Sequence, residues 1–390
     1  MTKTPLPHRA AKGMDMRVLQ LISSKGHYGA ESMLLTLCEA LKPLSWCPVV
    51  GMIRNSRRPN LETAKCARSL GLEVVVFDCA GRLDWSAARK ICNYLQEQKV
   101  NLIHTHGYKA DIYGFAAARD LHIPMVATCH SLPNRQTRSA GLDYFYGFLD
   151  RLVLRSFGRV VAVSIKLADS LQKRGIQQGR IAMIHNGVPM MRFAKASPTF
   201  GEEINKGKRT VVGMIARLVP GKGPDLFLQA AQAVLKGFPK TLFAMIGNGP
   251  ERKKLEGLVR KLKIEDSVIF AGERHDMPEV YASLDIVVLP SLSEGMPMSI
   301  LEAMAAGKPV VASSVGAIPS VVLPGQTGLL IEPGDLVGLR AAMERLLSDP
   351  GLRTRLGEEG QRMINRLYSA DVMAQKYLHV YQQVLDGQAA

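Results

Sequence analysis

The chain has 390 residues, too many for one ordinary domain, and 47% of them are hydrophobic, which predicts a fully folded protein of two α/β domains. No run reaches the roughly 18 apolar residues of a membrane-spanning helix. Residues 1–15 lack the apolar segment of a signal peptide, so we expect a cytoplasmic protein.

The sequence contains no recognisable metal-binding pattern. Its six cysteines form no C-x-x-C pair and no zinc spacing with histidine, and we expect them to be reduced thiols. No D-x-D occurs, so a carboxylate-held Mg²⁺ or Mn²⁺ is not predicted. We therefore expect no metal and no other cofactor.

The net charge of +16 is concentrated in one half of the chain. Residues 1–195 contain 28 Lys and Arg against 13 Asp and Glu, whereas residues 196–390 contain 22 against 21. A basic half attracts phosphorylated ligands, anionic lipid or nucleic acid, although charge that only confers solubility is the alternative. Because no nucleic-acid-binding motif accompanies the charge, we expect an anionic small ligand or an anionic membrane surface.

The first half alternates short apolar runs with helical patterns, which predicts a parallel, doubly wound sheet. The chain opens with a strand at 16–22, a loop that contains Gly26 and Gly29, and a helix at 32–41. This order suits a phosphate, although a tight turn is an alternative role for the glycines. Further strands are predicted at 49–53, 73–77, 102–106, 125–129, 160–163 and 181–184, with helices at 59–70 and 85–98 between them.

Polar residues follow two of these predicted strands. His106 ends one strand and is followed by Lys109, and His130 follows the next strand. Histidine donates hydrogen bonds or relays protons near neutral pH, so we expect both histidines at a functional edge of the sheet, with a structural role as the alternative. His104 is expected on the opposite face of the strand from His106, so that the two do not reach one site.

Residues 132–159 are basic and aromatic, with apolar residues at helical spacing. A helix of this kind would dock on an anionic membrane surface, although packing of its aromatic residues in the core is the alternative. Residues 191–208 have the weakest pattern, and we predict an inter-domain linker there.

The second half restarts the pattern with a strand at 210–215, a loop and a helix at 225–236. Arg217 and Lys222 flank this loop. Two cations beside a helix start suit a diphosphate, which arginine binds through two hydrogen bonds; solvated loop cations are the alternative. Strands are also predicted at 241–246, 268–271, 284–289 and 310–313, with helices at 335–347, 353–367 and 370–385.

The most informative stretch runs from Leu289 to Gly307. It reads as a strand end, a turn through Gly295, and a helix that starts near Pro297 and stops at Gly307. Glu294 then lies in the strand-to-helix loop and Glu302 inside the helix. Two carboxylates beside the free amides of a helix start suit a ligand that has several hydroxyls and a phosphate, such as a nucleotide sugar.

Several short motifs then occur in the order known from one enzyme family. They are Gly26-x-x-Gly-Ala-Glu31, His104-Thr-His-Gly-Tyr-Lys109, Asn186-Gly-Val-Pro189, Arg217-x4-Lys222, Gly247-Asn-Gly-Pro-Glu251, Glu294-x7-Glu302 and Gly325-x-Thr-Gly-Leu329. Together they resemble glycosyltransferase family 4, the retaining GT-B enzymes of the group 1 type, from about residue 16 to 385. The chain departs from the family at Ala317 and Ser320, where Gly and Glu are common.

The resemblance implies an α/β GT-B architecture of two Rossmann-like, doubly wound domains that face a cleft. Residues 1–190 would form the acceptor-binding domain, with a crossover helix at 370–387 packed on it. Residues 209–369 would form the nucleotide-sugar-binding domain.

The resemblance also implies roles for individual residues. Carried over by position, the donor would be bound by Gly29, Arg217, Lys222, Gly247, Arg274, Glu294, Gly295, Met296, Pro297 and Glu302. Catalysis would rest on His106, Arg217, Lys222 and Glu294, while His130 and Lys109 would contact the acceptor. Glu294 would hold sugar hydroxyls, Glu302 the ribose, and the two cations the diphosphate.

We therefore predict a metal-independent retaining glycosyltransferase that uses a nucleotide-diphosphate sugar. The basic half indicates a phosphorylated or lipid-linked saccharide acceptor in cell-envelope synthesis, with peripheral membrane contact. A sugar-nucleotide epimerase of the same fold and a non-catalytic sugar-nucleotide-binding protein are the alternatives.

Overall fold

The computed structural model describes residues 16–23, 26, 29–56, 60–81, 84–130, 140–204, 207 and 209–387, leaving aside the side chains of 140–146. The chain divides into two compact units. The first contains Met1–Cys129, Pro133–Val160 and Val380–Ala390, and the second contains His130–Leu132 and Val161–His379. The N-terminal 15 residues and the basic segment 131–139 lie outside the described residues.

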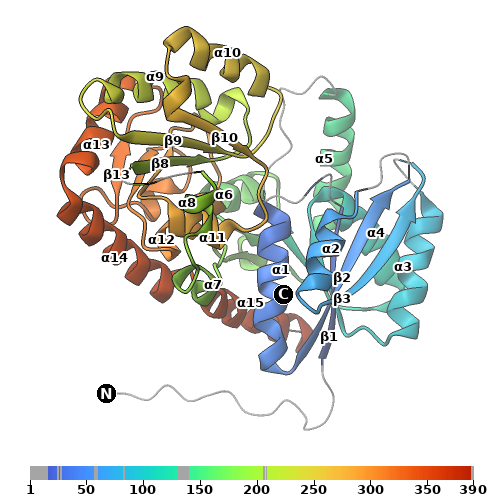
Figure 1. Ribbon diagram of the computed structural model, residues 1–390. Helices are drawn as coiled ribbons and strands as arrows, with labels where there is room; N and C mark the ends of the chain where they lie inside the picture. The colour runs from blue at the N-terminus through green and yellow to red at the C-terminus, as the bar shows by residue number, and fades with distance from the viewer. Residues whose placement is uncertain are drawn as a thin grey trace, which may run out of the picture. The chain divides into compact units, whose positions relative to one another are not determined.

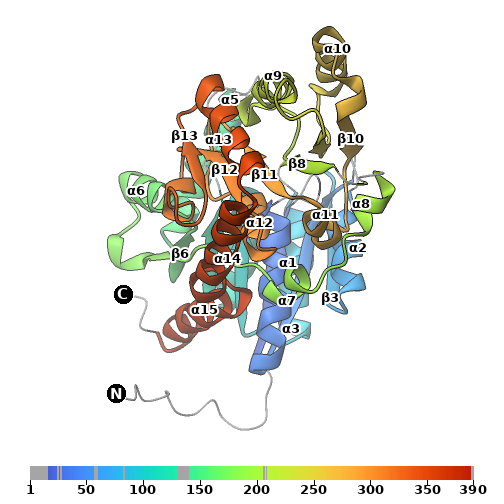
Figure 2. The same cartoon turned by 60° about the vertical axis from the view of Figure 1, so that its left-hand side comes forward.

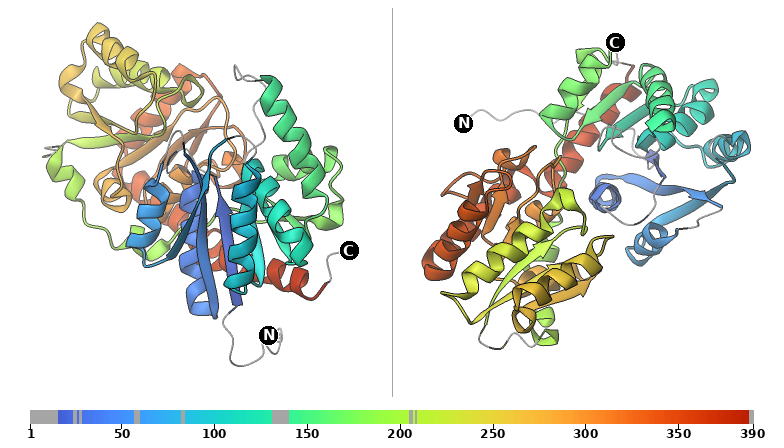
Figure 3. Two further views of the ribbon diagram at one scale, coloured as in Figure 1. Left: turned by 90° about the vertical axis from the view of Figure 1, so that its right-hand side faces the viewer. Right: turned by 90° about the horizontal axis from the view of Figure 1, so that it is seen from above.

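The first sheet has seven strands in the order β3-β2-β1-β4-β5-β6-β7, and the recorded pairings among β1 to β5 are parallel (Figure 1). The left panel of Figure 3 shows several of these strands side by side. Its elements are β1 (Met16–Ile22), α1 (Gly29–Leu41), β2 (Trp46–Asn55), α2 (Glu62–Ser69), β3 (Glu73–Cys79), α3 (Trp85–Glu97), β4 (Leu102–His106), α4 (Tyr108–Ala118), β5 (Met125–Cys129), α5 (Ala140–Leu154), β6 (Arg159–Ala162), α6 (Ile165–Lys173) and β7 (Ile181–Met183).

Alternate side chains of the first sheet bury on opposite faces, as the pleat of a strand requires. Leu19 and Leu21 of β1 pack into a cluster with residues of α3 and α4. Ile22 and Met52 pack into a second cluster with residues of α1 and α2. The strands therefore read as continuous apolar runs, because both faces are covered.

The second sheet has six strands in the order β10-β9-β8-β11-β12-β13, and every pairing is parallel. The elements of this half are α7 (Met190–Ala194), α8 (Thr199–Glu203), β8 (Thr210–Ile215), α9 (Pro224–Leu235), β9 (Thr241–Ile246), α10 (Arg252–Leu262), β10 (Val268–Gly272), α11 (Met277–Ser283), β11 (Ile286–Leu289), α12 (Met298–Ala305), β12 (Val310–Ser313), β13 (Leu329–Ile331), α13 (Leu336–Ser348), α14 (Pro350–Leu367) and α15 (Ala370–Leu385). One face packs on α9, α10 and α13, and the other on α11 and α12. The predicted α/β fold of two doubly wound parallel sheets is confirmed.

Residues 191–208, expected as a linker, contain α7's end and all of α8. Phe193, Phe200 and Ile204 are buried in the core cluster that also holds Tyr281 of α11. The Phe193 and Tyr281 rings meet edge to face with centroids 5.7 Å apart. Residues 191–204 of this stretch are therefore packed on the second sheet's helices through a few well-spaced apolar residues.

Helix α14 is held against α12 through glycine (Figure 2). A Cβ at Gly357 would lie 2.1 Å from the carbonyl oxygen of Gly307, so a larger residue would force the two segments apart. The next helix, α15, carries the predicted apolar stripe, whose members are all at most 8% exposed: Met373, Tyr377, Val380, Tyr381 and Val384.

Each sheet has a topological switch point, where the strand order reverses. It lies between β1 and β4 in the first sheet and between β8 and β11 in the second. Loops that leave the carboxyl ends of two such neighbouring strands diverge to opposite faces, and ligands of open α/β sheets bind in the crevice between them. Each switch point is therefore a candidate ligand site of its unit.

Candidate active site

The loops after β8 and β11 lie against each other at the switch point of the second sheet. The Leu292 amide donates to the carbonyl oxygen of Gly221 at 2.9 Å. Gly223 has φ +69°, and a Cβ there would lie 2.2 Å from the carbonyl oxygen of Pro290. Backbone contact this close leaves room only for glycine, so Gly223 sets the distance between the two loops.

This contact brings together two residues that the sequence placed in one site, Lys222 and Glu294. The Lys222 Nζ donates to Glu294 Oε1 at 2.5 Å, and the Ser291 hydroxyl donates to the same oxygen at 2.7 Å. The Glu294 side chain is only 6% exposed, whereas that of Lys222 is 29% exposed. A carboxylate so well shielded from water depends on its cation, because an unpaired buried charge is strongly disfavoured.

A third loop, after β12, buttresses the backbone of Glu294. Gly316 has φ +59°, and a Cβ there would lie 2.0 Å from the Glu294 carbonyl oxygen. The Ala317 amide donates to the carbonyl oxygen of Gly295 at 2.9 Å. Ala317 itself has φ −93°, a conformation that needs no glycine, so the family's second glycine is dispensable here.

Helix α12 starts where the stretch around Glu294 ends. Pro297 precedes its first turn with φ −73°, and no side chain caps this end. Met296 is buried in the core beneath, which anchors the loop. The amides at the start of α12 therefore point to the same edge of the sheet as Glu294, and the helix stops before Gly307 (φ +67°) as predicted.

Glu302 lies in α12, where Tyr281 holds it. The Tyr281 hydroxyl contacts Glu302 Oε2 and the Ser299 carbonyl oxygen, both at 3.0 Å. Burial raises the pKa of Glu302 to about 7, although the Tyr281 hydrogen bond and the charge of Arg192 oppose that rise. The carboxyl group is thus poised to titrate near neutral pH.

The raised pKa of Glu302 predicts a pH-dependent stability. The folded state holds its proton more tightly than the unfolded state, so stability is greatest at acidic pH and falls as pH rises from about 4.5 to about 7. The loss attributable to this residue is about 3 kcal/mol. We expect Glu302→Gln to remove this component. Urea unfolding of wild type and variant at pH 5 and pH 8 checks the result, and an equal pH dependence in both proteins would refute it.

Two other residues assigned to the donor lie in neighbouring loops. Gly247, after β9, has φ +128° and a Cβ there would lie 2.1 Å from the carbonyl oxygen of Ala216, so it fits the β9 loop closely to the β8 loop. Arg274, after β10, is held by Asp276 at 2.6 Å and 2.8 Å and by Glu203 at 2.7 Å. Its guanidinium therefore ties α8 to this loop, and the hydrogen bonds to both carboxylates raise its pKa.

Arg217 differs from Lys222 in its surroundings. Its side chain is exposed, and no hydrogen bond or ion pair joins the guanidinium to any residue that the structure describes. Its position in the β8 loop, five residues before Lys222, leaves its guanidinium able to meet an incoming anion.

In the first unit, His106 is part of a buried hydrogen-bonded chain at the β1–β4 switch point. His106 Nε2 lies 2.9 Å from Gln20 Oε1, and Gln20 Nε2 donates to the Tyr381 hydroxyl at 2.9 Å. That hydroxyl lies 2.7 Å from His104 Nδ1, and His104 Nε2 lies 2.7 Å from Thr128 Oγ1. All five side chains are at most 3% exposed.

The direction of this chain sets the protonation of both rings. Gln20 Oε1 only accepts, so His106 donates from Nε2. Tyr381 accepts from Gln20 and donates its own proton to His104 Nδ1, which makes His104 the Nε2–H tautomer that donates to Thr128. Tyr381, from the last helix, thus links Gln20, the partner of His106, to His104.

The expectation that His104 and His106 point to opposite faces of the strand is wrong. Side chains two residues apart share a face, since the strand period is two. The two rings lie 4.2 Å apart, centroid to centroid. His104 therefore supports His106 from within the same buried cluster.

We expect Tyr381→Phe to weaken this cluster. The substitution removes the acceptor for Gln20 and the donor to His104, which costs about 1–3 kcal/mol of unfolding free energy. If His106 acts in the site, loss of the Gln20 orientation is also expected to lower turnover. Tyr94→Phe is the matched control, because Tyr94 bonds Glu73 at the exposed end of the same sheet. Equal stability of the two variants would contradict the role of Tyr381.

The remaining predicted residues also lie near the carboxyl ends of β1, β4 and β5. Gly29 is the exposed first residue of α1. Lys109 lies in the first turn of α4 with its Nζ 5.7 Å from the Tyr113 ring centroid. His130 directly follows β5, and burial lowers its pKa to about 4, so the ring is neutral at pH 7.

Sequence reasoning missed the residues that position the predicted ones. They are Gln20, Tyr281, Ser291, Gly223 and Gly316. Gly223 directly follows Lys222, and a glycine next to a charged loop residue is a usable signal of close backbone approach, whereas Gly316 lies between Val315 and Ala317 and has no such neighbour. Gln20 and Tyr281 lie inside apolar runs, where nothing local shows which buried polar group they meet.

Two parallel, doubly wound sheets, with candidate ligand residues at both switch points, define the GT-B class of glycosyltransferases. A family model described as glycosyl transferases group 1 matches residues 198–363, and one described as glycosyltransferase family 4 matches residues 28–192. The chain belongs to this family of glycosyltransferases.

Relatives and solved structures agree with that assignment. The chain is 28% identical to the UDP-Gal:alpha-D-GlcNAc-diphosphoundecaprenol alpha-1,3-galactosyltransferase of Escherichia coli, covering 68% of this chain and 71% of that one. It is 27% identical to the N,N'-diacetylbacillosaminyl-diphospho-undecaprenol alpha-1,3-N-acetylgalactosaminyltransferase of Campylobacter jejuni, covering 84% and 90%. The fold resembles that of Anabaena Alr3699/HepE solved with UDP-glucose, with a TM-score of 0.81, 22% identity, and 94% and 100% coverage.

The described residues also bear on metals and membranes. No group of three or more His, Cys, Asp or Glu within them is arranged to hold a metal ion. Among the same residues, no helix is both long and apolar enough to cross a bilayer.

Proposed function

We propose that this enzyme transfers a glycosyl group, with retention of configuration and without a metal ion, from a nucleotide-diphosphate sugar to a hydroxyl of a lipid-linked or phosphorylated saccharide. The observation that carries the proposal is the Lys222–Glu294–Ser291 cluster at the switch point of the second sheet. A cation for the diphosphate and a carboxylate for sugar hydroxyls lie within one ligand's reach. The names of the two relatives above specify α-linked products on diphosphoundecaprenol acceptors.

In the proposed reaction, the bond between the anomeric carbon and the diphosphate oxygen breaks while a bond to the acceptor oxygen forms on the same face. The acceptor's proton passes to the departing diphosphate. Negative charge develops on that diphosphate, and Lys222 and Arg217 stabilise it. Glu294 holds the sugar, and Glu302, once it is ionised, accepts hydrogen bonds from the ribose hydroxyls. His106, in the first unit, contacts the sugar near the reacting carbon.

The acceptor is proposed to come from an anionic membrane surface at the cytoplasmic face. Helix α5 supports this, because Phe148 and Leu152 are 53% and 44% exposed one turn apart, with exposed Arg151 between them. Exposed apolar residues with flanking arginine are typical of helices that lie on anionic membranes. The side chains of residues 131–146, which contain most of the predicted aromatic and basic positions, lie outside the described residues.

The proposal is tested by incubating purified enzyme with a panel of nucleotide sugars, with and without a polyprenyl-diphosphate saccharide and with excess EDTA. We expect acceptor-dependent release of nucleoside diphosphate, an EDTA-insensitive rate, and a product whose anomeric configuration, read by NMR, matches the donor's. Conversion of donor without acceptor would favour the epimerase alternative. Binding without turnover of any donor would favour the non-catalytic alternative.

A further inference from the structure

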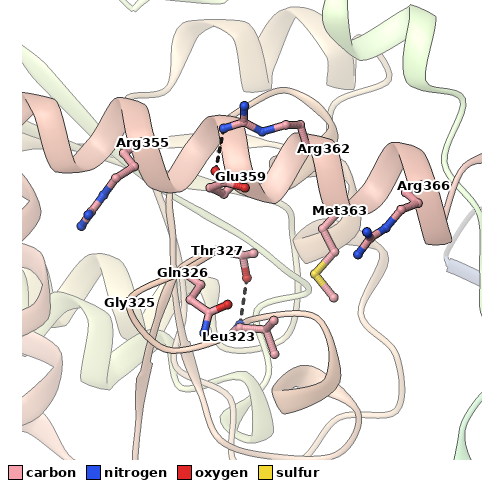
Figure 4. A pocket seen from close by; sticks show the side chains of 9 residues that line it. All are labelled: Leu323, Gly325, Gln326, Thr327, Arg355, Glu359, Arg362, Met363 and Arg366. Carbon is pink, nitrogen blue, oxygen red and sulfur yellow. Dashed lines mark hydrogen bonds and ion pairs between the residues drawn. The ribbon is translucent and has the colours of Figure 1, made fainter.

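A pocket of about 750 Å³ lies on the second unit, between α14 and the loop that precedes β13 (Figure 4). Its lining residues are Leu323, Gly325, Gln326, Thr327, Arg355, Glu359, Arg362, Met363 and Arg366. The loop enters the sheet at the amino end of β13, whereas the loops of Lys222 and Glu294 leave the sheet at carboxyl ends. The pocket is therefore separate from the candidate donor site, and its volume is that of a typical small-molecule site.

The charge of this pocket comes from one stripe of α14. Arg355, Glu359, Arg362 and Arg366 recur at intervals of four, three and four residues, so they share a face of the helix. Glu359 accepts from Arg362 at 2.8 Å. The side chains of Arg355 and Arg366 make no hydrogen bond or ion pair with any residue that the structure describes. The guanidinium groups of Arg355 and Arg366 thus have no ionic partner among the described residues, and they lie toward opposite ends of the pocket, as Figure 4 shows.

The framework around these arginines is rigid. The opposite face of α14 is locked onto the α12 segment through Gly357 and Gly307. The loop is closed by Thr327, whose hydroxyl donates to the Val321 carbonyl oxygen at 2.9 Å and accepts from the Leu323 amide at 2.8 Å. Because these elements are already fixed, binding of a ligand to their charged groups costs little conformational entropy.

The spacing of the arginines restricts the ligand. Arg355 and Arg366 are eleven residues apart, which is roughly 16 Å along a helix, so a single phosphate does not reach both. Guanidinium groups bind phosphate through paired hydrogen bonds, and Met363 and Leu323 add an apolar wall between the ends. We propose that this pocket binds a ligand that carries two or more phosphate groups, either a soluble molecule or the headgroups of an anionic lipid.

The test compares wild-type protein with Arg355→Gln/Arg366→Gln and with the control Arg340→Gln/Arg345→Gln, which removes two charges from the neighbouring helix α13. Inorganic tripolyphosphate is titrated by calorimetry at low salt. We expect the pocket variant to lose one binding site per chain, or to bind there at least about tenfold more weakly, while the control is unchanged. Sedimentation with phosphatidylglycerol and phosphatidylcholine vesicles identifies the source: loss of phosphatidylglycerol binding in the pocket variant alone indicates lipid, and loss of tripolyphosphate binding alone indicates a soluble ligand.

Identical binding by the pocket variant and the control in both experiments overturns the proposal, as does a wild-type protein that binds neither probe. The glycosyl-transfer proposal is judged separately by turnover, which we expect the pocket variant to retain because none of its altered residues touches the donor loops. Circular dichroism melting of each variant checks that the fold is kept.

Discussion

Replacement of Lys222 by alanine is expected to lower turnover by about 10²–10³-fold, and replacement of Arg217 to have an effect of the same kind. We expect Lys222 to act twice in the site. It would neutralise the departing diphosphate, and in the structure it already balances the shielded Glu294 carboxylate at 2.5 Å. Its loss would leave the shielded Glu294 carboxylate with only the Ser291 hydroxyl among the partners described above, which is unfavourable for a buried charge.

The measurement is steady-state turnover of a working nucleotide sugar, with Lys236→Ala as the control at an exposed lysine of the same half of the chain. The double variant Lys222→Ala/Glu294→Gln separates the two actions of Lys222. The double variant has no unbalanced carboxylate, so we expect it to recover the stability that Lys222→Ala loses. We do not expect it to recover turnover, because the cation for the diphosphate is still missing. Unchanged turnover in Arg217→Ala/Lys222→Ala would show that these cations do not stabilise the leaving group.

Replacement of Gly223 by alanine is expected to damage both stability and turnover. The residue has φ +69°, which costs an L-residue about 1–2 kcal/mol, and the new Cβ would lie 2.2 Å from the carbonyl oxygen of Pro290. The β8 and β11 loops must separate to relieve that contact. Because their contact brings Lys222 to Glu294, we expect at least about tenfold lower turnover and a loss of about 2 kcal/mol or more in unfolding free energy.

Gly221→Ala is a sharp control for this prediction. Gly221 lies two residues earlier in the same loop, and a Cβ there would meet nothing within 4 Å. We expect this variant to fold and turn over nearly as the wild type does. Thermal melts and turnover of the two variants, measured side by side, test the prediction. Equal melting temperatures and equal turnover would show that the loops tolerate a side chain at Gly223.

Local signals were sufficient to predict most of the fold. Strand β1, strand β9 and helix α15 begin and end at the predicted residues, because apolar runs and apolar stripes of this length have one reasonable interpretation. The prediction was weakest at residues 191–208, where α7 and α8 are short and three apolar residues anchor an otherwise polar stretch. Short helices stabilised by tertiary packing have no strong periodicity of their own.

The sequence predicted which residues belong to the candidate site, but not how their side chains are arranged. Arg274 was assigned to the donor by position from the family resemblance, and the sequence did not indicate that its guanidinium is held by Asp276 and Glu203. Glu203 is 71 residues away in the sequence, and no local pattern reports such a partner. The roles of the individual site residues in donor binding and catalysis remain predictions that the variants above test.

The sequence alone determined that the chain forms two parallel α/β sheets and that Glu294, Glu302, Arg217 and Lys222 belong to loops and helices at their functional edge, because periodicity and turn chemistry are local properties. Only the tertiary structure decided which of these groups touch. The Lys222–Glu294 contact spans 72 residues, and the link from Gln20 to Tyr381 spans 361. Such contacts depend on strand order and on close backbone packing at Gly223 and Gly316, which arise only when the sheet is assembled.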